Sequence, residues 1–125
     1  MINRILHASV IVADTARSLE FYRDVLGLRV DESRPDLGYP GAWLTINEQQ
    51  QIHLLELPNP DPTDGRPVHG GRDRHTALAV SDFAALVDTL SKRRIPYTLS
   101  RSGRQALFVR DPDGNTLELI ADESR

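Results

Sequence analysis

Two stretches of this sequence, His7-Ala-Ser-Val-Ile-Val-Ala-Asp14 and His75-Thr-Ala-Leu-Ala-Val-Ser-Asp82, match in kind at every position. Each begins with His, continues with small and apolar residues and ends in Asp. Asp favours the N-cap of a helix because its carboxylate accepts the free N–H groups of the first turn. A helix is therefore expected after each stretch, and the chain is predicted to contain two copies of one unit.

The two expected helices share their apolar spacing. Apolar residues recur every three or four positions after each Asp, at Leu19, Tyr22, Val25 and Leu26 in the first copy and at Phe83, Leu86, Val87 and Leu90 in the second. Gly27 and Pro96 follow these segments and are residues that commonly end helices.

The other apolar segments are predicted to be β-strands. They are Leu28–Ser33, Ala42–Asn47 and Gln51–Leu57 in the first copy, and Tyr97–Arg101, Gln105–Val109 and Asn115–Ile120 in the second. Asp111-Pro-Asp-Gly114 has the composition of a turn between the last two. Each copy is thus strand, helix, strand, strand, strand: residues 1–57 form the first module and 75–125 the second. Residues 58–74 form the linker: Pro58–Pro67 is too rich in Pro and Gly for regular structure, and the glycine pair at 70 and 71 indicates flexible or unusual backbone.

Composition excludes several classes of protein. The 125 residues include no Cys, which removes disulfides, thiolate metal sites and Cys nucleophiles. The formal net charge of −3, without a basic block, argues against nucleic acid or an anionic membrane as partner. No apolar run approaches the roughly 20 residues that a spanning helix needs. We therefore expect a soluble, cytoplasmic protein whose chemistry comes from His, carboxylates, hydroxyls or a bound metal ion.

Polar residues occupy equivalent places on the apolar strands of the two copies. His7 corresponds to His75, and aligning Gln51–Leu55 with Thr116–Ile120 sets His53 against Glu118. A polar side chain among Leu and Ile on a buried sheet is costly unless it is paired or metal-bound. The pattern predicts one divalent ion held by His7, His53, His75 and Glu118. Imidazole with a carboxylate suits Zn, Ni, Fe(II), Co or Mn.

Other residues are given simpler interpretations. Glu56 lies three residues from His53 and is expected to face away from it, because strand side chains alternate. His69 is interpreted as a surface residue of the linker, and Trp43 as a core residue or, with Tyr39, as part of an apolar lid. The arginines Arg72, Arg74, Arg101 and Arg104 are expected to be solvated loop residues, unless they meet an anionic substrate.

The repeat resembles the vicinal oxygen chelate superfamily, which groups glyoxalase I, methylmalonyl-CoA epimerase, extradiol dioxygenases, fosfomycin-resistance thiol transferases and bleomycin-resistance proteins. The resemblance runs from about Ile5 to Ala121 and is carried by Leu6-His7, by Ser18–Tyr22 with Leu26-Gly-Leu28, and by Phe108–Leu119. It implies an α+β fold in which tandem βαβββ modules form a cupped, partly open mixed β-sheet barrel with helices outside. In that family each half supplies two ligands from its first and last strands to one metal ion.

The resemblance leaves three functions open. In a glyoxalase- or epimerase-like lyase or isomerase, Glu118 would be both ligand and proton shuttle. In an extradiol-type dioxygenase, His7, His75 and Glu118 would form the facial triad of Fe(II). A drug-binding module like the bleomycin-resistance proteins would need neither a metal ion nor a proton shuttle. Glyoxalase I carries a carboxylate where this chain has His53, whereas the epimerases carry Gln. Dimers are common in the family, so we expect a homodimer whose sites lie within one chain or are shared.

Overall fold

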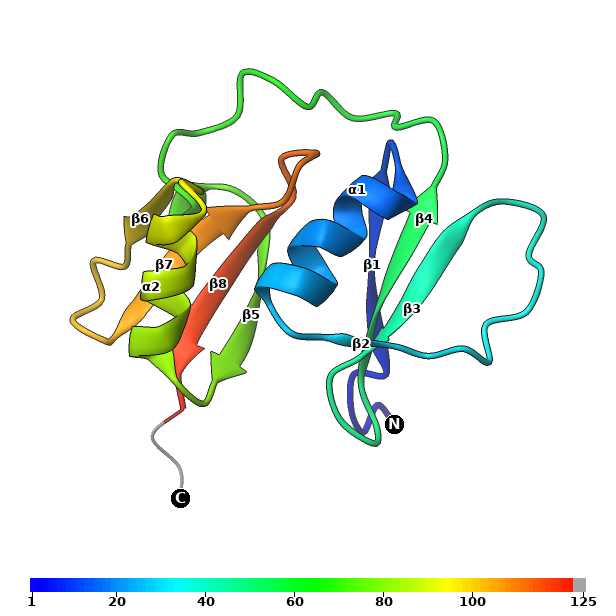
Figure 1. Cartoon of the computed structure of the whole chain (residues 1–125), viewed down its shortest axis with the longest axis horizontal. Helices are drawn as coiled ribbons and strands as arrows, with labels where there is room; N and C mark the ends of the chain where they lie inside the picture. Colours follow the sequence, from blue (N-terminus) through cyan, green and yellow to red (C-terminus); the bar gives the residue numbers. More distant parts are fainter. Residues whose placement is uncertain (123–125) are drawn as a thin grey trace. The chain divides into compact units, whose positions relative to one another are not determined.

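The computed structural model describes residues 1–122, and its strands form two separate four-stranded sheets (Figure 1). The chain divides into two compact units after Asp61. The first unit contains β1 (His7–Val12), α1 (Thr15–Leu19), the π-helix η1 (Glu20–Val25), β2 (Arg29–Val30), β3 (Gly41–Thr45) and β4 (Gln51–Glu56). The second contains the 3₁₀ helix η2 (Gly70–Arg72), β5 (His75–Val80), α2 (Phe83–Lys92), β6 (Tyr97–Leu99), β7 (Ala106–Arg110) and β8 (Thr116–Ala121).

The two sheets have the same topology. Their strand orders are β1-β4-β3-β2 and β5-β8-β7-β6. In each sheet the first strand pairs in parallel with the last, and the other neighbours are antiparallel. Each sheet is therefore mixed and open-edged, and is not closed into a barrel by itself. The predicted α+β architecture of tandem βαβββ modules is confirmed.

The register of the parallel pairs repeats as well. Ser9 lies opposite His53 in the first sheet, and Ala77 lies opposite Glu118 in the second. His7 and His75 each lie two residues before these partners, on the same face of the strand. The correspondence inferred from sequence between the two His residues, and between His53 and Glu118, is therefore present in the backbone pairing.

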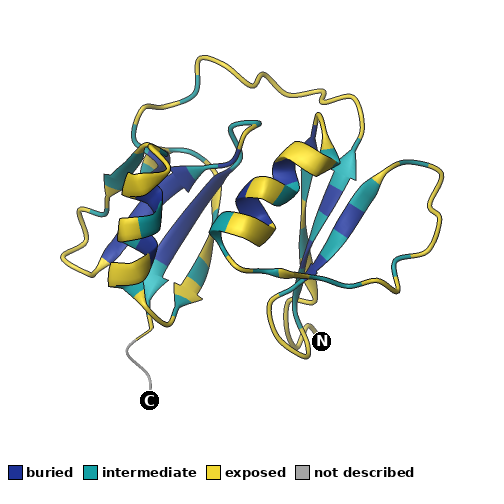
Figure 2. Ribbon diagram, viewed as in Figure 1, coloured by how far each residue is buried: buried dark blue, intermediate teal, exposed yellow. Residues whose placement is uncertain are grey.

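In the first unit, β3 and β4 are buried at alternate positions, whereas β7 and β8 of the second unit are buried at consecutive positions along most of their length (Figure 2). The fully buried side chains include Val12, Tyr22, Leu44, Ile52 and Leu54 in the first unit and Leu90, Leu107, Val109, Leu117 and Leu119 in the second. His7, His53, His75 and Glu118 occupy the opposite strand positions. Among residues 1–122, no helix has the length and apolar character needed to cross a membrane.

The helix starts follow the prediction. The Asp14 carboxylate accepts the backbone N–H of Arg17 at 3.3 Å, and that of Asp82 accepts the N–H of Ala85 at 3.0 Å. Glu56 adds a second cap in the first unit, because its Oε1 accepts the N–H of Thr15 at 2.7 Å. Glu56 therefore points away from His53, as predicted.

The structure shortens one expected strand to two residues and places a helical turn in the linker. The strand expected over Leu28–Ser33 is limited to Arg29–Val30, because Asp31 Oδ1 accepts both the N–H of Ser33 at 3.0 Å and its hydroxyl at 2.7 Å. That local turn takes the backbone out of the ladder. In the linker, the glycine pair that was expected to mark unusual backbone begins the 3₁₀ helix Gly70–Arg72. A Cβ at Gly70 would lie 2.6 Å from Thr116 Cγ2, so only Gly allows this close approach to the second sheet.

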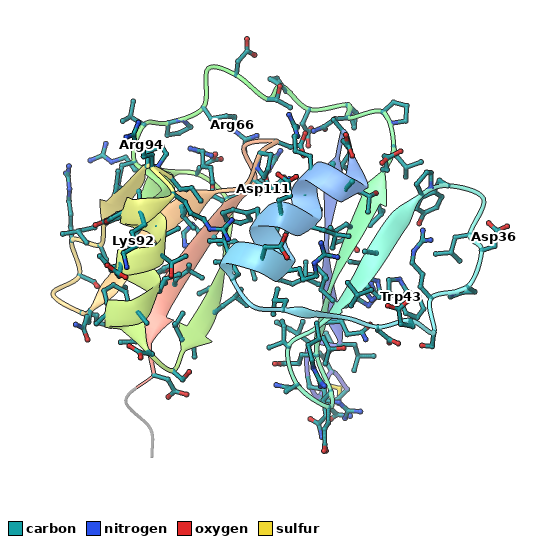
Figure 3. All side chains as sticks on the ribbon, viewed as in Figure 1. Asp36, Trp43, Arg66, Lys92, Arg94 and Asp111 are labelled. Atoms are coloured by element: carbon teal, nitrogen blue, oxygen red, sulfur yellow. The ribbon has the colours of Figure 1, made fainter. Side chains whose placement is uncertain are left out.

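A buried ion-pair cluster fixes the end of the linker. Asp73, whose side chain is only 9% exposed, accepts from Arg66 Nη2 at 2.7 Å and from Arg110 Nη1 at 2.8 Å (Figure 3 labels Arg66). The Arg66 hydrogen bond is the main cause that holds the pKa of Asp73 far below its usual range, against the opposing effect of burial. The cluster joins a linker residue to strand β7.

We expect Asp73→Asn to destabilise the protein by about 2–3 kcal/mol at pH 7, since it leaves two arginines without their shared carboxylate. Because the pKa of Asp73 is lowered by folding, its contribution is complete above about pH 4 and decreases as the pH falls toward the folded-state pKa. Urea unfolding at several pH values measures this. Asp88→Asn is the control, because the Asp88–Lys92 pair is 61% and 75% exposed; equal effects of both substitutions at pH 7 would contradict the prediction.

Candidate functional site

A stack of three rings covers the open face of the first sheet. The His53 ring lies 3.9 Å from that of His7 and 4.7 Å from that of Trp43, with interplanar angles of 12° and 10°. His7 comes from edge strand β1, and Trp43 from β3, where it lies opposite His53 in the register (Figure 3). The prediction that Trp43 belongs to the core is wrong. It is half-buried and stacks on the face that carries the candidate ligands.

Hydrogen bonds determine which nitrogen of His53 carries hydrogen. Gln51 Nε2 donates to Asp31 Oδ2 at 2.8 Å, and the same amide's Oε1 lies 2.9 Å from His53 Nε2. Since the amide oxygen only accepts, Nε2 of His53 carries hydrogen and Nδ1 presents a lone pair. His53 would thus bind a metal ion through Nδ1, or through Nε2 after releasing Gln51. The ring nitrogens of His7 have no hydrogen-bond partner among residues 1–122.

The surroundings of His53 favour its neutral form. Burial is the main cause that lowers its pKa, and the charges of His7 and Arg34 lower it further, while Asp31 raises it. A neutral imidazole is the form that binds metal ions.

The two histidines line a hollow in the first unit. The hollow has a volume of about 660 Å³, which is in the range of small-molecule sites. Its wall is formed by strand residues and by the turn between β3 and β4, namely Leu6, His7, Asp31, Trp43, Thr45, Asn47, Glu48, Gln49, Gln51 and His53.

The second pair of predicted ligands also comes together. His75 Nε2 lies 3.4 Å from Glu118 Oε1, and Glu118 is only 7% exposed. His75 Nδ1 lies 2.8 Å from the carbonyl oxygen of Asp73, which only accepts, so Nδ1 carries hydrogen. The remaining lone pair of His75 therefore faces a carboxylate oxygen. Two acceptors in this arrangement are satisfied by a cation between them, either a proton or a metal ion.

Phe108 lies between the two histidines of this unit. It is opposite Glu118 in the register, and its ring lies 5.0 Å from that of His75 and 5.1 Å from that of His69, both nearly perpendicular. His69 Nδ1 also lies 2.8 Å from Thr98 Oγ1. The interpretation of His69 as a simple surface residue is thus wrong, because it is half-buried against the sheet. It is not part of the His75–Glu118 pair.

Each unit therefore presents two of the four predicted ligands, His7 with His53 and His75 with Glu118. Within residues 1–122 the structure contains no group of three or more His, Asp or Glu side chains placed to hold a metal ion. Asp31 and Gln51 were not expected at the site from the sequence. Gln51 lies two residues before His53 on the same strand face, and that alternation is a signal from which it was predictable.

The donor atoms fit a divalent ion of the zinc type. Three imidazoles and one carboxylate are ligands that such ions accept, and a tightly held ion usually takes four donors or three donors with a water molecule. The backbone carbonyl behind His75 and the amide beside His53 are the kind of second-layer partners that orient metal-binding imidazoles. The two donors of a single unit are therefore too few to hold such an ion tightly.

Comparisons with known proteins identify the family. Residues 4–119 match the model of the Glyoxalase/Bleomycin resistance protein/Dioxygenase superfamily, and the chain belongs to this superfamily. It is 30% identical over 128 residues to the lactoylglutathione lyase of Haemophilus influenzae, covering 97% of this chain and 94% of that protein. It is also 30% identical to the lactoylglutathione lyase GLX1 of Arabidopsis thaliana, with 94% of this chain aligned, but it spans only 44% of that protein's length.

Solved structures show the same fold. A glyoxalase/dioxygenase from Nostoc punctiforme matches with a TM-score of 0.74 and 22% identity, covering 97% of this chain and 92% of that one. TnmS3, an antibiotic binding protein from Streptomyces, matches with a TM-score of 0.74 and 18% identity, covering 98% of both chains. Proteins with different activities therefore share this architecture, so the fold alone does not define the reaction.

Trp43 is the only Trp in the chain, so its fluorescence reports on the His53 stack. A protonated imidazole against the indole face is expected to quench this emission. Because the pKa of His53 is lowered, quenching should begin as the pH falls and have its midpoint below about 6.5.

His7→Ala removes one of the charges that lower this pKa, so the midpoint should rise in that variant. His75→Ala, in the other unit, should leave it unchanged. The prediction fails if the wild-type fluorescence midpoint lies at or above pH 6.5. It also fails if the pH-dependent quenching of Trp43 persists in His53→Ala.

Proposed function

We propose that this protein is a divalent-metal-dependent enzyme of the glyoxalase type, with lyase or isomerase chemistry on a small molecule that offers adjacent oxygens. The observation that carries the proposal is the repeated pair of donors on equivalent strands, His7 with His53 and His75 with Glu118. These four residues are the proposed ligands of one ion per site: Zn, Ni, Fe(II), Co or Mn. The relationship to proteins named lactoylglutathione lyase supports the same reaction class.

Glu118 is the proposed catalytic base, since it is the one carboxylate among the four donors. Its oxygen accepts a proton from the substrate carbon next to a carbonyl, and the electron pair moves onto the carbonyl oxygen. The hydroxyl proton on the first carbon moves to the former carbonyl oxygen, and Glu118 delivers its proton to the carbon that bears that oxygen, so the hydroxyl and the carbonyl exchange places with no atom lost. A bound divalent ion supplies a Lewis acid that stabilises negative charge on the adjacent oxygens, an effect worth several kcal/mol.

The surroundings of Glu118 suit this role. Only 7% of the residue is exposed, so few water molecules compete for the proton. Leu117 and Leu119 are both 2% exposed and hold the strand on its other face, which fixes the carboxylate relative to β7 and β5. His53 stands where glyoxalase I has a carboxylate, so Glu118 is the one carboxylate among the four proposed ligands.

Metal content is the first test. Protein purified without chelators is expected to contain about one divalent ion per set of four ligands, and Glu118→Ala or His75→Ala should lose most of it. Elemental analysis measures this, and Asp88→Asn is a control that changes one exposed carboxylate of the second unit. No metal in the wild type, even after anaerobic reconstitution with each ion, would overturn the proposal and favour a binding module.

Activity tests the role of Glu118. Glu118→Gln keeps the size of the side chain and removes the base, so lactoylglutathione lyase activity of the reconstituted protein should fall by about 10²–10⁴-fold. Equal activity of Glu118→Gln and wild type would contradict the proposed base. Iron dependence with oxygen consumption on a catechol would instead favour the dioxygenase, with His7, His75 and Glu118 as its facial triad.

We expect a homodimer, and a mixing experiment determines how its sites are built. One variant carries His7→Ala with His53→Ala, and the other carries His75→Ala with Glu118→Ala. If each site takes donors from two chains, mixing and refolding the variants restores one intact site in every mixed dimer. If each site lies within one chain, no metal binding returns. Metal titration of the mixture, beside each variant alone, distinguishes the two.

A further inference from the structure

One arginine contacts the proposed catalytic base. Arg104, in the loop between β6 and β7, places Nη2 3.4 Å from Glu118 Oε2. The other oxygen of the same carboxylate lies 3.4 Å from His75 Nε2. The two oxygens of Glu118 therefore face different partners, one a candidate metal ligand and the other a cation.

Most of the hydrogen-bonding capacity of Arg104 is unused. A guanidinium has five N–H donors in a planar fork. Besides the Glu118 contact, the Arg104 side chain makes one long contact, from Nε to Ser102 Oγ at 3.4 Å. The side chain is 59% exposed, so the remaining donors are open to a ligand.

A purely structural role does not account for this placement. Because Arg104 is 59% exposed and its contact with the buried Glu118 carboxylate is long, at 3.4 Å, this ion pair contributes modestly to stability, about 1 kcal/mol. A fixed positive charge beside a metal-binding carboxylate also repels a divalent cation. The arrangement becomes favourable when an anion binds, because the anion accepts hydrogen bonds from the open N–H groups of Arg104 and offsets the repulsion between the guanidinium and the metal ion.

We propose that Arg104 binds an anionic group of the substrate, and hence that the substrate is an acid, carrying a carboxylate near the adjacent oxygens that the metal ion chelates. This inference rests on the proposed function. It adds a substrate-binding residue, because the planar guanidinium of Arg104 can donate two parallel hydrogen bonds to a carboxylate. When Glu118 shares its charge with a metal ion, its attraction for Arg104 decreases, and the fork is free to pair with the substrate.

The chain offers a matched control. Arg101 lies in the same loop, is exposed, and makes no side-chain hydrogen bond or ion pair among residues 1–122. Replacing either arginine by Gln changes the net charge equally, but only Arg104→Gln removes a group that contacts Glu118. Arg104→Lys keeps the charge and loses the fork.

The experiment measures the binding of two probes to zinc-loaded protein by calorimetry. Acetohydroxamate chelates a metal ion through adjacent oxygens, and N-hydroxysuccinamate has the same chelating group with an added carboxylate. The wild type should prefer the second by about tenfold or more, as expected for a charge-assisted hydrogen bond. Arg104→Gln should reduce that preference to less than about threefold, Arg104→Lys should keep part of it, and Arg101→Gln should keep all of it.

Zinc content and the thermal unfolding midpoint are measured on the same samples before the probes are added. If zinc is bound and Arg104→Gln keeps the wild-type preference, the Arg104 inference is wrong while the proposed function stands. If Arg104→Gln weakens both probes equally or changes only zinc affinity, Arg104 acts on Glu118 alone and the inference is again wrong. If zinc does not bind, the probes are measured with whichever of nickel, iron(II), cobalt or manganese does. If the wild type binds none of the five ions, the proposed function fails and this inference fails with it.

Discussion

The parallel pairing of the first and last strands of each unit is the constraint on which both candidate pairs depend. A parallel pair needs a long crossover, and in each unit the helix and two further strands lie between the paired strands. The helix then covers one face of the sheet, and apolar side chains must occupy that face. Polar residues on the paired strands are left on the opposite face. His7 meets His53, and His75 meets Glu118, because both pairs obey this one register.

Two of the imidazole donors, His53 and His75, are oriented by hydrogen bonds before any ligand arrives. Gln51 holds His53 through a chain that ends at Asp31, and the carbonyl of Asp73 holds His75. Orienting a side chain in advance removes the entropy cost of ordering it at the moment of binding. The two units achieve this differently, with a side-chain amide in one and a backbone carbonyl in the other.

Asp73 links stability to the site. Its carboxylate pairs with Arg66 and Arg110, which fixes the end of the linker on β7, while its backbone carbonyl orients His75. The first residues of β5 are thus positioned by an ion-pair cluster outside the candidate site. Gly70 contributes to the same end of the linker, because a larger residue there would collide with Thr116 and Phe108.

The sequence alone determined the repeat, the order of elements and the capping residues Asp14 and Asp82, because strand alternation and helix spacing are local properties. It also identified the four candidate donors, but the register of the parallel strands is what brings them together in pairs. Only the tertiary structure decided that Trp43 stacks on His53, that His69 packs against Phe108, and that Arg104 reaches Glu118. These contacts join residues from different strands and loops, and their partners follow from register and loop paths rather than from local pattern. Likewise the short strand at Arg29–Val30 reflects a side-chain turn at Asp31 that competes with the ladder.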